Sequence, residues 1–164
     1  MADQPLKINI GSGNEVLDGY KSVDLFVPAD IKDDITKLDT FSDSTVDEVR
    51  TYHLLEHLRD PDVPIAIKQV YRVLKKYGKW TIEVPDFIWL IDDFLSTPES
   101  GRWGWKIQTI FGMQCNDGEY HKTGFSRNRL YTMLVNGGFG NVTVEERFSK
   151  KYNQGVLDAV AYKL

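Results

Sequence analysis

Short apolar runs alternate with a few segments of helical periodicity, and this alternation is the feature that most constrains the fold. Strands are predicted at Leu6–Ile10, Tyr20–Leu25, Asp30–Ile35, Val46–Tyr52, Lys79–Val84, Val142–Phe148 and Val156–Tyr162. Strands that alternate with helices are typical of an α/β fold, with a mostly parallel sheet covered on both faces. In such sheets ligands bind beyond the carboxyl ends of the strands, so the residues after each strand are the first candidates for a site.

Local signals mark the ends of the predicted helices. Apolar residues recur with helical spacing over Asp62–Lys76, and Gly78 follows as a stop signal. Ser126 is a good N-cap for a helix that reaches Asn136, where Gly137 and the next glycine end it. The aromatic-rich stretch 87–111 predicts two further helices.

Length and charge limit the kind of protein. We expect the 164 residues to form a single domain over 1–164. The net charge is −4 and the basic residues form no run, so no nucleic-acid partner is expected. The single cysteine, Cys115, cannot form an internal disulfide, and no apolar stretch reaches the ~20 residues of a membrane span. Because Met1–Pro5 also lacks the regions of a signal peptide, we expect a cytoplasmic protein without a membrane partner. The oligomeric state is not predicted.

A glycine turn and an acidic residue follow the first two predicted strands. Gly11-Ser-Gly13 allows backbone amides to approach a ligand, and Asp24 ends the next strand, where a carboxylate can accept hydrogen bonds from ribose hydroxyls. A nicotinamide dinucleotide fits poorly, because the third glycine of its fingerprint is replaced by Val16. Asp24 also follows Gly13 by only 11 residues, whereas the fingerprint needs about 20. The short gap predicts little or no helix after the first strand.

Eight segments carry a resemblance to a known family, and they occur in the family's order. They are Lys7–Gly13, Gly19–Leu25, Asp34–Leu38, Val46–Val49, His53–Leu58, Tyr71–Gly78, Trp80–Asp86 and Tyr120–Ser126. The chain resembles the class I S-adenosylmethionine-dependent methyltransferases, in the methyltransferase type 11-like branch, with a shortened first crossover. The resemblance implies a Rossmann-like methyltransferase sandwich, with a mostly parallel seven-stranded sheet and an antiparallel last strand. It also implies S-adenosylmethionine as the cofactor.

The resemblance assigns roles to individual residues. Gly11 and Gly13 would hold the methionine end of the cofactor, Asp24 the ribose, and Asp34 the adenine amine. The other expected cofactor contacts are Asn9, Ser12, Leu25, Ile35, Tyr52 and His53. Carboxylates suit these partners chemically, because hydroxyl and amine groups donate hydrogen bonds and the sulfonium is a cation.

Two positions depart from the family pattern. Asn9 stands where an acidic residue is common, and Glu15 replaces a third glycine. The implied reaction is in-line transfer of a methyl group to a small-molecule or glycan-type acceptor, such as a sugar. Because of the two departures and the lack of a sizeable acceptor domain, a non-catalytic S-adenosylmethionine-binding relative remains an alternative.

The segment His53-Leu-Leu-Glu56-His57 matches the H-x-x-E-H pattern of one class of zinc peptidases. A zinc hydrolase is therefore a second alternative. A catalytic zinc usually needs a third protein ligand, and no partner motif appears downstream. The segment also follows a predicted strand instead of lying within a long helix. We therefore expect no metal site, and we interpret these side chains as part of the cofactor rim.

Two histidines are candidate catalytic bases if the acceptor is a hydroxyl. His121 and His53 are both expected near the cofactor, and a neutral imidazole is available near pH 7. His121 is favoured because its loop carries Gly118 and Gly124, which would let it close over an acceptor.

Overall fold

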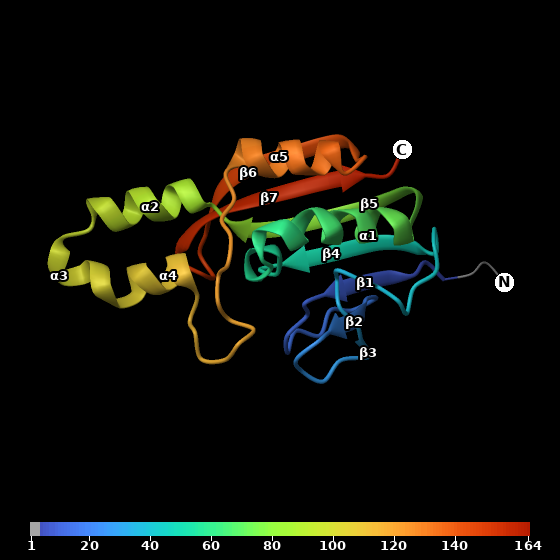
Figure 1. Cartoon of the computed structure of the whole chain (residues 1–164), viewed down its shortest axis with the longest axis horizontal. Coiled ribbons are helices and arrows are strands. Elements are labelled where there is room, and N and C mark those ends of the chain that lie inside the picture. Colours follow the sequence, from blue (N-terminus) through green and yellow to red (C-terminus); the bar gives the residue numbers. More distant parts are fainter. Residues whose placement is uncertain (1–3) are drawn as a thin grey trace.

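The computed structural model describes residues 4–164 as one seven-stranded sheet with helices packed against it (Figure 1). Residues 1–3 of the amino-terminal stretch considered above lie outside the described residues. The strands are β1 (Lys7–Ile10), β2 (Lys21–Asp24), β3 (Ile31–Lys32), β4 (Val46–Tyr52), β5 (Leu74–Pro85), β6 (Gly140–Ser149) and β7 (Gln154–Tyr162). Their order is β3-β2-β1-β4-β5-β7-β6, and β7 is antiparallel to both of its neighbours. The predicted mostly parallel sheet with an antiparallel last strand is confirmed.

Helical segments connect the later strands. They are η1 (Leu55–His57), η2 (Asp60–Asp62), α1 (Val63–Val73), α2 (Phe87–Ser96), α3 (Glu99–Gly101), η3 (Arg102–Lys106), α4 (Ile107–Phe111) and α5 (Arg127–Asn136). The segments α2 to α4 form an arm that extends beyond the sheet (Figure 1). Among the described residues, no helix combines the length and apolar character needed to cross a membrane.

The best-predicted helix is α5, because its end signals are local. The Ser126 hydroxyl accepts a hydrogen bond from the amide of Arg129 at 3.3 Å and so caps the first turn. The helix ends at Asn136, and Gly137 donates back to the Met133 carbonyl. Gly138 follows with a φ of +100°, a conformation that glycine adopts readily.

The helix α1 ends at Val73, three residues before the predicted end at Lys76. The amides of Ser44 and Thr45 donate to the carbonyls of Arg72 and Val73, at 3.0 and 2.9 Å, and thereby satisfy the last turn. The next residue, Leu74, already pairs with β4. Gly78 therefore lies inside β5, and its expected role as a helix stop was wrong.

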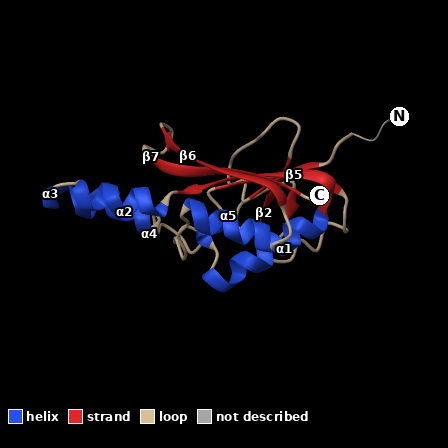
Figure 2. Cartoon of the chain, turned by 90° about the horizontal axis from the view of Figure 1, so that it is seen from above, coloured by secondary structure: helices blue, strands red, loops and turns tan. Residues whose placement is uncertain are grey.

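The expectation that helices cover both faces of the sheet was also wrong. Figure 2 shows the helices on one side only. The connections 11–20 and 33–45 contain no helix, so within residues 4–164 nothing helical covers the opposite face. On the covered face Trp80 is fully buried and donates from its indole nitrogen to the Thr51 hydroxyl at 2.9 Å. On the bare face lie ion pairs such as Lys79 with Glu48, at 2.8 Å.

Candidate functional site

A cavity of about 440 Å³ lies at the carboxyl ends of β1, β2 and β4. This volume lies within the ~300–1,000 Å³ typical of small-molecule sites. Most of the predicted cofactor residues line it, namely Gly11, Gly13, Asp24, Leu25, Asp34, Ile35 and His53. The structure thus brings together residues from separate connections, as expected for a site at this edge of the sheet. We call this the first cavity.

The glycine turn is held tightly against β2. The amide of Gly11 donates to the Val23 carbonyl at 2.8 Å, and the φ of Gly11 is +67°. A Cβ at this position would lie only 2.8 Å from the side chain of Leu54. A glycine is required here by both backbone conformation and close approach.

The Asp24 carboxylate organises the same turn from the other side. One oxygen accepts from the amide of Gly13 at 2.9 Å, and the other accepts from Phe26 and Val27 at 2.8 and 3.2 Å. A carboxylate offers about four acceptor positions, so it can still accept from a ligand hydroxyl. Asp34 likewise accepts from the amide and hydroxyl of Thr36, at 2.9 and 2.8 Å.

The other predicted cofactor residues, Asn9, Ser12 and Tyr52, do not line the first cavity. Ser12 is buried within the glycine turn. The Asn9 side chain accepts from Arg50 at 2.9 Å, and the Arg50 guanidinium lies 3.6 Å from the centre of the Tyr52 ring.

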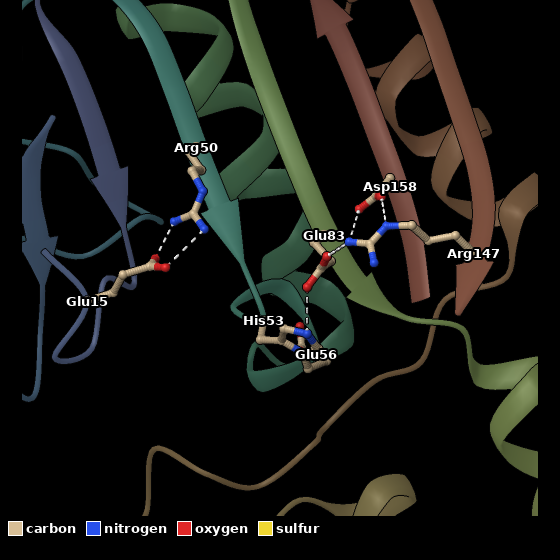
Figure 3. Close-up of polar contacts among 7 residues, drawn as sticks. All are labelled: Glu15, Arg50, His53, Glu56, Glu83, Arg147 and Asp158. Carbon is tan, nitrogen blue, oxygen red and sulfur yellow. Dashed lines mark hydrogen bonds and ion pairs between the residues drawn. The ribbon is translucent and has the colours of Figure 1, made fainter. Parts of the chain in front are cut away.

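Glu15, which stands where the family pattern has a third glycine, has an ion-pair partner on β4. Arg50 pairs with Glu15 at 2.6 Å, beside the glycine turn (Figure 3). The hydrogen bond from Arg50 holds the pKa of the Glu15 carboxyl below its usual value. The two departures from the family pattern, Asn9 and Glu15, are therefore linked through one arginine. No feature of the sequence spacing indicated this pairing.

His53 is held between two buried carboxylates (Figure 3). Its Nδ1 lies 3.1 Å from Glu56 Oε1, and its Nε2 lies 3.0 Å from Glu83 Oε1. Ionised carboxylates only accept hydrogen bonds, so both ring nitrogens must donate. Burial alone would lower the pKa of His53, but the hydrogen bonds to Glu56 and Glu83 outweigh it and raise the pKa to about 9. A residue that is already protonated at neutral pH cannot accept a proton, which argues against the expectation that His53 is a base.

The same network balances the negative charges of the two buried glutamates. Burial by itself would raise the pKa values of Glu56 and Glu83, but hydrogen bonds from His53 lower both below the usual value. Glu83 also pairs with Arg147, which pairs in turn with Asp158 (Figure 3). Both glutamates are therefore ionised.

A second cavity, of about 280 Å³, adjoins the first. Its lining residues are His53, Glu56, His57, Trp105, Gln108, Thr109, Gly112, Met113, Glu119, His121, Tyr152 and Gln154. His53 and His57 line both cavities and so belong to a shared wall. Burial lowers the pKa of His121, which keeps its imidazole neutral at physiological pH. The sequence singled out His121, but no spacing signal indicated that it would lie beside His57.

The loop that carries His121 is tied down through its backbone. The amide of His121 donates to the Phe111 carbonyl at 3.0 Å, and the amide of Lys122 donates to the Glu56 carbonyl at 2.7 Å. His57 Nδ1 lies 3.1 Å from the Tyr120 carbonyl oxygen. The bonds from Lys122 and His57 join the loop to η1 beside the second cavity.

The H-x-x-E-H segment does not form the zinc-peptidase arrangement. Its first histidine precedes η1 with a φ of +51°, so His53 and His57 do not share the face of one regular helix. Both nitrogens of His53 are used by carboxylates, which leaves none for a metal ion.

Comparisons with known proteins relate the chain to methyltransferases. The family described as "Methyltransferase domain" (Methyltransf_11) matches residues 18–82. A comparison with curated proteins gave no significant match.

Solved structures of methyltransferases share the fold over almost the whole chain. One is a S-adenosylmethionine-dependent methyltransferase from Thermotoga maritima, a possible histamine N-methyltransferase, with 16% identity, a TM-score of 0.66, and coverage of 97% of this chain and 82% of that chain. Another is 1,6-didemethyltoxoflavin-N1-methyltransferase from Burkholderia thailandensis, with 15% identity, a TM-score of 0.67 and coverage of 98% and 72%.

A third is a phosphoethanolamine N-methyltransferase from Haemonchus contortus, with 14% identity, a TM-score of 0.65 and coverage of 99% of this chain and 50% of that chain. Identities this low show a shared fold, and the family match adds the relationship over residues 18–82. The family match thus relates residues 18–82 to the methyltransferase domain, and almost the whole chain has the fold of S-adenosylmethionine-dependent methyltransferases.

Proposed function

We propose that the chain transfers a methyl group from S-adenosylmethionine in the first cavity to a small acceptor in the second. The observation that carries the proposal is the shared wall, since His53 and His57 line both cavities. In the reaction, an acceptor atom donates an electron pair to the methyl carbon as the carbon–sulfur bond breaks. The electrons of that bond stay on sulfur, so the sulfonium becomes a neutral thioether. Holding the two reactants in line can lower the activation free energy by about 7–11 kcal/mol.

The first cavity offers each part of the cofactor a suitable partner. The backbone around Gly11 and Gly13 would receive the methionine end, Asp24 the ribose hydroxyls and Asp34 the adenine amine. Leu25 and Ile35 supply apolar contacts for the adenine ring. Asn9, Ser12 and Tyr52 would act indirectly, by supporting the turn or the Arg50 pair.

The second cavity favours a small acceptor. Its volume of about 280 Å³ suits a molecule of the size of one sugar or one heterocycle. The neighbours from Burkholderia and Haemonchus have small-molecule ligands in their structures, 1,6-didemethyltoxoflavin and phosphomonomethylethanolamine. A sugar hydroxyl or an amine is the acceptor class that we propose.

His121 is the residue that we propose as the base for a hydroxyl acceptor. It faces the second cavity and its lowered pKa keeps it neutral, so it has a nitrogen available to take the proton. His53 would instead position the shared wall through Glu56 and Glu83.

The cofactor assignment is tested by calorimetric titration with S-adenosylmethionine, S-adenosylhomocysteine and a nicotinamide dinucleotide. We expect the two adenosyl-sulfur compounds to bind. At a ligand concentration a hundred times the dissociation constant, the free energy of unfolding of the protein should rise by about 2.7 kcal/mol. Asp24→Ala should weaken binding by about 1.5–3 kcal/mol. Asp18→Ala is the matched control, because it removes an exposed carboxylate from the loop that precedes β2. Absence of binding at millimolar S-adenosylmethionine would remove the proposal.

A further inference from the structure

We propose that Glu56, His57 and His121 form a binding site for a divalent transition-metal ion, at the wall between the two cavities. One ligand atom from each residue lies within 4.8 Å of the other two. Around a tetrahedral zinc ion with bonds near 2.1 Å, neighbouring ligand atoms are about 3.4 Å apart. Small rotations of the side chains would close that difference. This set of ligands differs from the zinc-peptidase arrangement that the H-x-x-E-H pattern predicts, because His121 comes from a distant loop and His53 is excluded.

Glu56 supplies the strongest indication of a cation site. Its side chain is only 2% exposed, and it lines the second cavity. Oε1 faces His53, whereas Oε2 is buried and has no hydrogen-bond partner among the described residues. A buried charged oxygen without a partner costs free energy, so such atoms usually face water, an ion or a ligand.

His57 has the tautomer that a metal ligand needs. A carbonyl oxygen only accepts hydrogen bonds, so His57 Nδ1 must donate to the Tyr120 carbonyl, 3.1 Å away. In the neutral ring, Nε2 is then unprotonated and carries the lone pair. A backbone carbonyl that receives the other ring proton is the usual support of a metal-binding histidine.

His121 lies next to His57, with the ring centres 5.0 Å apart in an edge-to-face arrangement. Its nitrogen therefore completes a set of two imidazoles and one carboxylate. Zinc with an open position and non-haem iron both use this donor set, whereas calcium and magnesium favour oxygen ligands alone. The chemical class of the ion is thus a first-row divalent metal, with open positions toward the second cavity.

The location suggests what the ion does, and this role rests on the proposed methyl transfer. An acceptor hydroxyl bound to the metal would lose its proton more easily, just as zinc lowers the pKa of bound water to about 7. The proton would pass to solvent, and the oxygen would then attack the methyl carbon. In the metal-bound form His121 is a ligand, and the metal replaces it as the activating group.

Metal binding is measurable without any acceptor. Untagged, metal-stripped protein is titrated with Co²⁺, followed by its visible absorption, and with Zn²⁺, followed by calorimetry. We expect one equivalent to bind. The variants Glu56→Gln, His57→Ala and His121→Ala should each weaken binding by more than the roughly 10–100-fold effect of losing a supporting residue. Glu119→Gln removes another carboxylate from the same cavity and should leave the affinity unchanged.

The outcomes separate the metal site from the methyl-transfer proposal. Absence of saturable binding at about 0.1 mM metal, or equal affinity in all variants, would overturn the site. S-adenosylhomocysteine titration of Glu56→Gln and His121→Ala reports independently on folding and on the first cavity, because neither residue lines that cavity. Glu56→Gln keeps the shape of the side chain, so it tests the site even if a histidine variant fails to fold. Metal binding without cofactor binding would retain the site and remove the proposed function.

Discussion

The two halves of the sheet are stabilised in different ways. In the β4–β7 half, helices α1 and α5 pack on the sheet and bury side chains such as Trp80. In the β1–β3 half the connections are loops, and aspartate side chains fix them by accepting from backbone amides. Asp24 holds the glycine turn, and Asp30 accepts from the amide of Ser22 at 2.8 Å. Because some of these carboxylates also line the first cavity, the loop half combines its structural anchors with its ligand contacts.

The largest effect should come from the helical half. Trp80→Ala should lower the free energy of unfolding by about 3–5 kcal/mol, because it leaves a cavity and removes the hydrogen bond to Thr51. Denaturant titration measures the loss. Trp103→Ala is the matched control, since that tryptophan is 65% exposed on the arm. Similar losses in both variants would show that burial against the helices does not dominate this half.

In the loop half, Asp24→Ala should destabilise the protein even without cofactor. The substitution leaves the amides of Gly13, Phe26 and Val27 without their acceptor, and about 1–3 kcal/mol of unfolding free energy should be lost. Thermal unfolding of the ligand-free variant measures this loss of stability, with Asp18→Ala as the control. If the ligand-free variant kept wild-type stability, Asp24 would be a ligand contact alone and the contrast between the halves would weaken.

A smaller effect is expected at the start of α5. Ser126→Ala removes the acceptor of the Arg129 amide and should cost about 1 kcal/mol. Ser96→Ala removes a hydroxyl at the carboxyl end of another helix, α2, where it does not cap backbone amides. This substitution should cost less. Chemical denaturation of both variants gives the comparison. Equal costs would mean that the cap adds nothing to the helical half.

The smallest effect concerns the pair that joins the two halves, Glu15 and Arg50. The pKa of Glu15 is lowered from 4.5 in the folded protein, so its stabilising contribution is present above that value and is lost as the pH falls below it. Because the pair is partly exposed, the contribution should stay below about 1 kcal/mol. Arg50→Met should remove this part of the acid dependence, measured by unfolding between neutral and acidic pH. An unchanged acid profile would show that the pair does not couple the halves.

Local signals predicted the parts of the fold that local chemistry determines. The bounds of β4 were predicted as Val46–Tyr52, as observed, and the cap at Ser126 identified α5. The end of α1 was missed because Ser44 and Thr45, far away in the sequence, satisfy its last carbonyls.

The same limit applies to the site. The glycine turn and Asp24 lie close in the sequence, so their juxtaposition could be inferred, and the structure places both on the first cavity. The approach of His121 to His57 depends on backbone bonds between a late loop and η1, and no spacing rule reports such contacts. Helices on both faces were expected from the general pattern of alternating elements. The short gap after the first strand already predicted little or no helix there, and the connection 33–45 contains none either.

The tether between the late loop and η1 has a consequence for selectivity. With the amides of Lys122 and Thr123 both bound to the Glu56 carbonyl, at 2.7 and 3.3 Å, that wall cannot swing outward without breaking main-chain bonds. The second cavity should therefore keep its width on this side, which favours small guests over bulky ones.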